Sequence, residues 1–284
     1  MDRVSVFCFL ASYAVATGFE FLRLRTSKAW LQTLTIGMSI AGLVAHTVYL
    51  LSRSFQADLP PLMASSHDWL LVLAWLAVLF YLFLTLLDTT VPLATFVLPI
   101  VLALVVTSRF VSLEPLSFVK GEASQAAARG WLMLHVSMLA FGIVGVLASL
   151  ILAAMYLVQH RRLKHRHGSP EGMHLPSLAR LARWNWWAVV VSVPLLTFGM
   201  AAGVLLGLST KTVSTPVVFS DPVVIGSCVG WLVMVGFFGW LVGTSRPVAK
   251  QVALLTIWAC SFLVVTIVGL QVITSSSGLG SLHS

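Results

Sequence analysis

Histidine is the residue type in this sequence with the clearest capacity for chemistry. Four of the eight histidines lie in or beside long apolar segments: His46, His67, His135 and His283. Ionisable groups inside such segments are costly to bury and usually face an interior or a cavity. Because histidine also commonly ligates haem iron, the four are candidate ligands. The alternative is that each imidazole anchors a helix end in the headgroup region.

The other four histidines lie in one basic segment. These residues are His160, His165, His167 and His174, and they are interleaved with Arg161, Arg162, Lys164 and Arg166. A metal site is one interpretation, but neighbouring cationic side chains would repel a metal ion, so a solvated basic loop is favoured. Residues 175–184 carry apolar residues at three-residue spacing with arginines between them. This pattern predicts a short interfacial helix leading into the aromatic belt.

Two aspartates stand at expected helix starts. Asp221 precedes Pro222, which suits a helix N-cap with proline at the first helical position. A functional role for Asp221 stays open beside this structural one. Asp68, directly before Trp69, invites the same capping interpretation.

The cysteines point away from thiol chemistry. Cys8, Cys228 and Cys260 each lie in an apolar segment, and the sequence has no CxxC motif. The chain is therefore predicted to be neither a dithiol reductant nor a covalent c-type haem carrier. All three are expected to behave as buried small hydrophobes.

Composition sets the fold class. Of the 284 residues, 58% are hydrophobic and only 9% are charged, whereas soluble domains carry roughly 25% charged residues. A span needs about 20 apolar residues, so the sequence predicts one all-α membrane domain over residues 1–284, a bundle of about eight transmembrane helices. The predicted spans are 4–21, 30–51, 69–87, 91–107, 130–158, 187–208, 223–242 and 252–274. A soluble enzyme, a disordered chain and a disulfide scaffold are excluded.

The basic residues predict orientation. Eleven of the seventeen Lys and Arg residues lie in the connections after spans one, three, five and seven, chiefly in the basic loop 160–186. The positive-inside rule therefore predicts that both termini are extracytoplasmic, in a multi-pass protein of a bacterial inner (plasma) membrane. Because the net charge of +8 comes from short loops between spans, no nucleic acid is expected as a partner.

Small residues predict close helix packing in the second half of the chain. Gly199, Gly203 and Gly207 form a ridge on the sixth predicted span. Gly226 with Gly230, and Gly145 with Ser149, repeat the four-residue spacing. Lipid offers no hydrophobic drive for helix association, so such ridges favour close backbone contact.

Several ordered motifs resemble the cytochrome c assembly family of haem-handling membrane proteins, which includes CcsA, CcmC and a HemX-like branch. The resemblance covers about residues 42–284. The segments that carry it are Ala45-His46-Thr47-Val48-Tyr49-Leu50, Asp68 seven residues before Trp75, Phe96-Val97-Leu98-Pro99, Trp131-Leu132-Met133-Leu134-His135-Val136, Leu175-Pro176-Ser177-Leu178 and Leu282-His283-Ser284.

The resemblance implies a non-covalent haem b site. It carries the two flanking axial ligands over to His135 and His283, the Asp-Pro of the haem-holding motif to Asp221-Pro222, and a later tryptophan to Trp231. His46 is implied as a third or alternate ligand. The tryptophans expected before the aspartate are absent, leaving Phe219, which makes the sequence more similar to the HemX-like branch.

The leading functional hypothesis is haem handling in cytochrome c biogenesis, with haem held near the extracytoplasmic face by histidine ligation. Implied partners are haem, other assembly subunits, apocytochrome c and the lipid bilayer. We expect no catalysis by this chain alone, at most a role as a subunit of a multi-component haem lyase. The alternative is a HemX-like membrane regulator of haem biosynthesis without haem transfer. A small-molecule transporter ranks lower, because no clear internal repeat is visible.

Overall fold

The chain forms a helical bundle. The computed structural model describes residues 5–26, 28–57, 65–89, 91–111, 126–165, 175–209, 222–245 and 247–276. Its helices are α1 (Val6–Thr26), α2 (Ala29–Ala57), α4 (Ser66–Leu87), α5 (Ala94–Ser108), α6 (Ala126–His165), α7 (Leu178–Ser209), α8 (Pro222–Gly243) and α9 (Ala249–Ser276). Since no strand occurs in these ranges, the predicted all-α fold is confirmed.

Seven of the helices are long and apolar enough to cross a membrane. The exception is α5, an apolar helix of 15 residues. Each predicted span coincides with one helix of the structure, α5 included. A polytopic helical membrane bundle is therefore the architecture of this chain.

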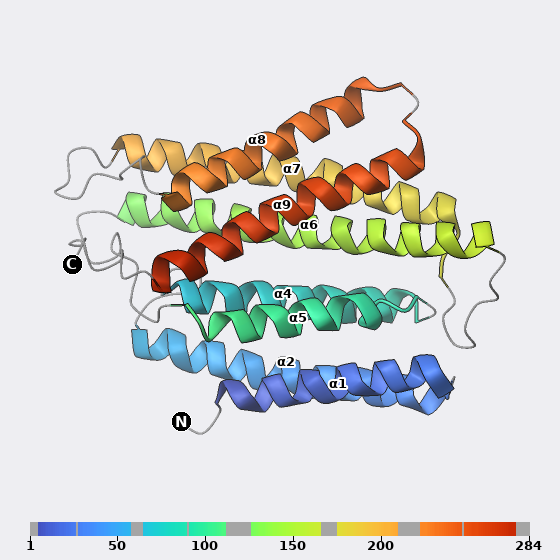
Figure 1. Ribbon diagram of the computed structural model, residues 1–284. Coiled ribbons are helices and arrows are strands. Elements are labelled where there is room, and N and C mark those ends of the chain that lie inside the picture. The colour runs from blue at the N-terminus through green and yellow to red at the C-terminus, as the bar shows by residue number, and fades with distance from the viewer. Residues whose placement is uncertain are drawn as a thin grey trace.

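The helices stack in antiparallel pairs (Figure 1). The α1–α2 pair lies at one side of the bundle, α4 and α5 come next, and α6 and α7 follow. The α9 helix crosses α6 obliquely and pairs with α8. In the middle of the stack, Leu70 and Leu71 of α4 and Leu98 of α5 are fully buried. Large apolar side chains such as Phe55 and Trp258 face outward, as expected of a lipid-facing surface.

The two ends of the bundle differ in charge. One end, called the basic end below, collects the cationic side chains at the C-terminal ends of α1 and α6 and the N-terminal ends of α2, α7 and α9: Arg23, Arg25, Lys28, Arg161, Arg162, Lys164, Arg180, Arg183 and Lys250. The opposite end, called the histidine end, holds His46, His67 and His135. The alternating helix directions also bring the start of α1 and the end of α9 to the histidine end (Figure 1).

Two helices extend beyond the apolar stretches that predicted them. Residues 160–165 continue α6, and residues 178–186 form the first turns of α7, although both were assigned to the basic loop. The separate interfacial helix predicted over 175–184 is therefore wrong. Hydropathy marks where a span leaves the apolar region, but Arg, Lys and Leu are good helix formers that let the helix continue.

The cysteines were predicted correctly only in part. Cys260 is buried and Cys228 is half-buried, but Cys8 lies exposed on the outside of α1. An apolar helix in a membrane protein has a lipid-facing side as well as a core side, so an apolar setting in the sequence does not establish burial.

The predicted glycine contacts between helices are confirmed at Gly145, Gly199, Gly203, Gly226 and Gly230. A Cβ at Gly199 would lie 2.8 Å from Leu139 Cδ2 of α6, and one at Gly145 would lie 2.7 Å from Ser192 Cβ of α7. On α8, Gly226 and Gly230 face Leu270 and Leu263 of α9 in the same way. Ser149 departs from its predicted ridge, because its hydroxyl lies 3.2 Å from the Cys260 sulfur of α9 rather than against α7.

Candidate functional site

His135 bridges α6 and α7 at the histidine end. Its Nδ1 lies 2.6 Å from the backbone carbonyl oxygen of Gly199. A carbonyl only accepts hydrogen bonds, so Nδ1 carries the proton and a neutral ring keeps its lone pair on Nε2. The hydrogen bond therefore fixes both the tautomer and the orientation of the half-buried imidazole.

A glycine on α7 makes room for this ring. A Cβ at Gly203 would lie 2.5 Å from His135 Cε1 and 2.7 Å from its Nδ1. Any larger residue at position 203 would occupy the space of the imidazole. The Gly199–Gly203 part of the ridge thus performs two tasks, since it permits close contact of α6 with α7 and it seats the histidine.

Trp231 lies on a different interface from His135. Its indole Nε1 donates to the hydroxyl of Thr197 at 3.1 Å, which joins α8 to α7. Thr197 and Gly199 are about 200° apart around α7 at 3.6 residues per turn. The two predicted site residues therefore contact opposite sides of the same helix.

His46 is enclosed between α1 and α2. Its side chain is 0% exposed, its ring stacks on Phe9 at a centroid distance of 4.1 Å, and its Nδ1 lies 3.3 Å from the Tyr13 hydroxyl. Nε2 is buried without a hydrogen-bond partner among the described residues. Gly42 admits the Tyr13 ring, because a Cβ there would lie 2.5 Å from Tyr13 Cε1. Nε2 is therefore closed to a ligand in this arrangement.

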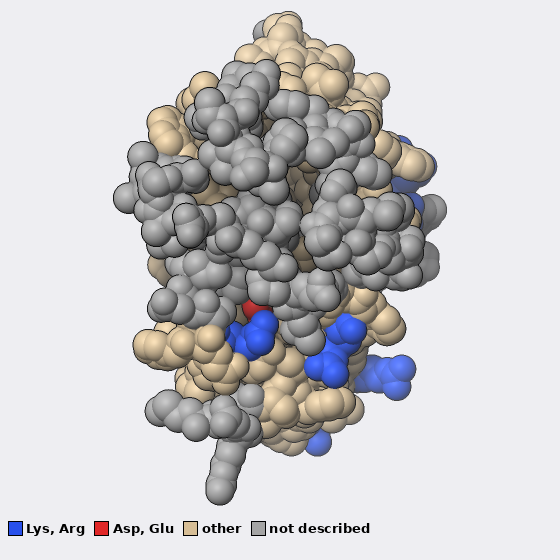
Figure 2. Space-filling view, turned by 90° about the vertical axis from the view of Figure 1, so that its left-hand side faces the viewer, with Lys and Arg blue, Asp and Glu red and all other residues tan. Residues whose placement is uncertain are grey.

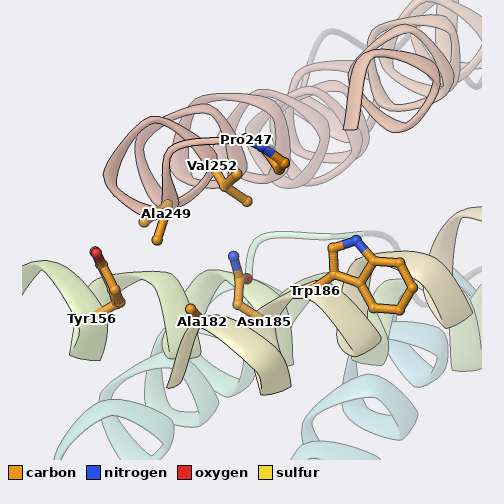
Figure 3. Close-up of a pocket in the computed structure, with 8 residues that line it drawn as sticks. Tyr156, Ala182, Asn185, Trp186, Pro247, Ala249 and Val252 are labelled. Atoms are coloured by element: carbon orange, nitrogen blue, oxygen red, sulfur yellow. The ribbon is translucent and has the colours of Figure 1, made fainter. Parts of the chain in front are cut away.

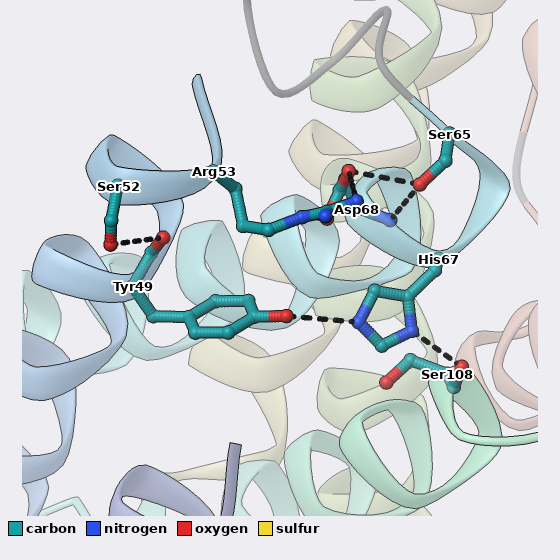
Figure 4. A network of polar contacts seen from close by, with 7 residues as sticks. All are labelled: Tyr49, Ser52, Arg53, Ser65, His67, Asp68 and Ser108. Atoms are coloured by element: carbon teal, nitrogen blue, oxygen red, sulfur yellow. Dashed lines mark hydrogen bonds and ion pairs between the residues drawn. The ribbon is translucent and has the colours of Figure 1, made fainter. Parts of the chain in front are cut away.

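His67 has both ring nitrogens engaged (Figure 4). Nδ1 donates to the Ser108 carbonyl of α5 at 2.7 Å, so Nε2 accepts from the Tyr49 hydroxyl of α2 at 3.4 Å. The imidazole thereby joins three helices. No ring lone pair remains for a metal ion, and His67 acts as a structural residue.

Asp68 forms a buried ion pair beside His67 (Figure 4). Arg53 of α2 reaches its two carboxylate oxygens at 3.0 and 3.3 Å, and the Asp68 side chain is 0% exposed. The helix cap is Ser65, whose hydroxyl accepts from the Asp68 backbone N–H and donates to its carboxylate. The capping interpretation of Asp68 itself is therefore corrected: Ser65 is the N-cap, and the Asp68 carboxylate accepts from the Ser65 hydroxyl and pairs with arginine.

The predicted site residues divide into separate groups. His46 belongs to the α1–α2 interface and His135 to the α6–α7 interface, and α4 and α5 lie between these pairs (Figure 1). His283 and Asp221 lie outside the described residues. Figure 2 views the histidine end, where an acidic residue lies beside Lys and Arg side chains in the lower half of the face. The described part thus brings His135 and Trp231 to one helix, α7, and leaves His46 apart.

Sequence reasoning missed the partners of these residues. Arg53 is the cation that pairs with Asp68, and Phe9 and Tyr13 enclose His46. An arginine at the end of an apolar helix was a usable signal, because buried carboxylates of membrane helices require a partner. Phe9 and Tyr13 carry no such signal, since aromatic residues are common in every span.

The histidine and glycine geometry on α6 and α7 lies within a region that matches a known family. The family model described as "Cytochrome C assembly protein" matches residues 63–279, well over half of the chain. The chain belongs to this family. The matched region includes His135, Gly203 and Trp231, whereas α1 and α2 precede it.

A relative supports the same branch of the family. Protein HemX of Brevibacillus brevis is 26% identical over 200 residues, which cover 69% of this chain and 70% of the relative. The predicted membership of the cytochrome c assembly family, close to its HemX-like branch, is thereby confirmed. No solved structure gives a significant match to the chain.

Proposed function

We propose that this protein holds haem in cytochrome c biogenesis, with His135 as one axial ligand of the iron. The observation that carries the proposal is the hydrogen bond from His135 Nδ1 to the Gly199 carbonyl. Metal-ligating histidines characteristically donate their second ring N–H to a carbonyl or carboxylate, which leaves the other nitrogen to the metal. Gly203 leaves the space that the imidazole ring occupies, whereas the side chain of any other residue at this position would fill that space.

His283 is proposed as the second axial ligand, on the strength of the closing motif that resembles the family. Asp221, directly before α8, is proposed to orient a histidine or to cap the loop beneath the porphyrin. Trp231 would supply apolar surface beside α7, with its indole N–H already held by Thr197. His46 stays in the proposal only as an alternate ligand, because α1 covers it.

The proposed haem is non-covalently bound haem b, carried as cargo rather than used for catalysis. By the positive-inside rule the basic end faces the cytoplasm of a bacterial inner membrane, so the histidine end faces the extracytoplasmic side. Covalent attachment of haem to an apocytochrome would require partner subunits, since the sequence lacks a cysteine pair of its own.

The test is the absorption spectrum of the detergent-purified full chain, oxidised and reduced with dithionite. Sharp reduced α and β bands are expected in the unmodified protein and should be lost in H135A and H283A. The matched control is H67Q, because both nitrogens of His67 are engaged in hydrogen bonds between helices. Bands that persist in both H135A and H283A would overturn the assignment.

A second candidate is regulation of haem biosynthesis through the basic end. It is favoured by the similarity to a HemX protein and by the absence of the tryptophans before Asp221. This function predicts that a tetrapyrrole-pathway enzyme co-purifies with the chain in a manner that depends on residues 160–183. A colourless protein that fails to take up added haem but retains such a partner would favour regulation over haem handling.

A further inference from the structure

A second polar feature lies near the basic end, well away from His135. Asn185 is the single asparagine of the sequence and lies in the third turn of α7. Its side chain is directed from α7 toward α9 (Figure 3), and the residue is only 2% exposed. A buried amide in an apolar helix is costly unless both its ends are satisfied.

The hydrogen bonds fix which end of the amide is satisfied. Nδ2 donates to the Thr256 hydroxyl oxygen of α9 at 3.1 Å. Thr256 in turn donates its own hydroxyl proton to the Val252 carbonyl at 2.8 Å, so it can only accept from Asn185. The carbonyl oxygen Oδ1 is therefore the remaining atom, and it is buried without a hydrogen-bond partner among the described residues.

Asn185 forms part of the wall of a small cavity between α6, α7 and α9. The cavity has a volume of about 110 Å³, and Figure 3 shows Tyr156, Ala182, Trp186, Pro247, Ala249 and Val252 among its lining residues. At roughly 30 Å³ per water molecule, it is too small for a porphyrin but large enough for a group of a few heavy atoms. The aromatic side chains of Tyr156 and Trp186 line it together with Asn185, the residue that carries the unsatisfied acceptor Oδ1. This combination suits an ammonium group, which donates N–H bonds and is attracted to aromatic rings.

Two cationic residues are next in sequence to residues that line the cavity. Arg183 and Lys250 are exposed and are the chain neighbours of the lining residues Ala182 and Ala249. Arg180 is engaged elsewhere, with Asp88 at 3.0 Å and the Trp184 ring at 4.3 Å. Arg183 and Lys250 therefore remain placed to attract an anion such as a lipid phosphate.

The surroundings indicate a molecule of the membrane interface. Trp186 and Trp187 pack edge to face at the start of α7, and interfacial tryptophans lie at headgroup depth. A ligand at this depth that carries an ammonium group close to a phosphate has the chemistry of an ethanolamine phospholipid headgroup.

We propose that this cavity binds the headgroup of phosphatidylethanolamine. The ammonium group donates to Asn185 Oδ1 beside Tyr156 and Trp186, and the phosphate lies toward Arg183 and Lys250. The site lies at the opposite end of the bundle from His135, so this proposal does not depend on haem binding.

Three lipids distinguish recognition of the positive charge from recognition of the N–H donors of the headgroup. The probes are dioctanoyl phosphatidylethanolamine, phosphatidylcholine and phosphatidylglycerol, added to the detergent-purified full chain and followed by native mass spectrometry and by the thermal midpoint Tm. Phosphatidylcholine carries the positive charge without N–H donors, and phosphatidylglycerol offers hydroxyl donors without the positive charge. One retained phosphatidylethanolamine and a rise in Tm confined to that lipid are expected.

Variants of the wall locate the site. N185L removes the acceptor at similar size and should weaken phosphatidylethanolamine binding about tenfold, the effect of losing one hydrogen bond to a charged donor. N185D keeps an acceptor and adds negative charge, so it should retain or strengthen that binding. W186L should weaken binding, whereas its matched control W187L, at an exposed neighbour, should change it less than about twofold.

Two results would overturn the proposal. One is equal retention of all three lipids with an equal rise in Tm, which would show that the ammonium group is not recognised at Asn185 Oδ1. The other is unchanged phosphatidylethanolamine selectivity in both N185L and W186L. Should N185L fail to fold, N185D and W186L still decide the matter. The lipid-free Tm of N185L is expected to equal or exceed that of the unmodified chain, because it removes an unsatisfied buried carbonyl.

Discussion

The two halves of the bundle are held together by different means. In the half made of α1, α2, α4 and α5, two buried carboxylates carry the polar contacts. Asp68 of α4 pairs with the half-buried Arg53 of α2 at 3.0 Å. Glu20 pairs with Arg23 within α1 at 2.7 Å and accepts a hydrogen bond from Thr95 of α5 at 2.8 Å. The half made of α6 to α9 joins its helices mainly at glycines, where neighbouring side chains occupy the space of the missing Cβ atoms, a contact that the first half has at Gly42.

Ion pairs and glycine contacts are two ways to hold helices together in lipid. Helices in lipid gain little from the hydrophobic effect when they associate, so packing and polar contacts must hold them. An ion pair selects one partner and one register but requires desolvation of two charges. A glycine contact avoids that cost but tolerates no added atom. The proposed haem ligand His135 lies in the glycine half, so its position depends on steric fit.

The largest expected effect comes from breaking the Arg53–Asp68 pair. R53M leaves the carboxylate of Asp68 buried without its cation and should lower the free energy of unfolding by about 3 kcal/mol, near the lower end for broken buried pairs. The lower end applies because Ser65 still donates to Asp68. The measurement is urea unfolding in detergent micelles, followed by tryptophan fluorescence.

The double variant R53M/D68N is the control for this effect. It leaves no unpaired charge, so it should recover most of the stability that R53M loses. Equal losses in the single and double variants would show that Arg53 acts through packing rather than through charge, and the contrast between the two halves would then fail.

A smaller effect is expected at the glycine contact. G203A places a methyl group against the rigid imidazole of His135 and should cost about 1–3 kcal/mol, typical of overpacking. The matched control is G239A, because an added Cβ there meets nothing within 4 Å and alanine favours the helix by about 0.5–1 kcal/mol. Unfolding free energies of the two variants, measured side by side, test the difference. Equal stability of G203A and G239A would contradict a steric role for Gly203.

The smallest effects are expected at a contact that both halves share, a hydrogen bond from a tryptophan indole to a threonine of a neighbouring helix. Trp75 donates its indole N–H to Thr47 at 2.8 Å, between α4 and α2, and Trp231 donates to Thr197 at 3.1 Å, between α8 and α7. T47V and T197V should each lose about 0.6 kcal/mol, the average for hydrogen bonds between membrane helices. A markedly unequal loss in the same unfolding assay would show that the surrounding half changes the strength of the bond.

Sequence reasoning predicted the helices well because hydropathy reports directly on membrane spans. It also predicted correctly that His46 and His135 lie toward the same end, since depth follows from position along a helix. It did not predict that they face different interfaces, because the direction of a side chain around a helix depends on tertiary packing. The Gly199–Gly203 ridge was visible in the sequence, but its partner His135 was not, as nothing local encodes which helix packs there.

Asn185 had a signal that was overlooked. It is the single asparagine of the chain and lies just before the predicted span 187–208, and polar residues in membrane helices usually have a specific partner. Its hydrogen bond to Thr256 joins positions 71 residues apart in the sequence. Only the fold could supply that pairing and the cavity beside it.

The uniqueness of Asn185 also makes it a spectroscopic reporter. Selective ¹⁵N labelling of asparagine side chains gives a single amide group in this chain, so its two N–H resonances need no assignment. The two protons differ in environment, because the Thr256 hydroxyl lies 3.1 Å from Nδ2. Their exchange with solvent deuterium therefore reports how often α7 and α9 part at this end of the bundle.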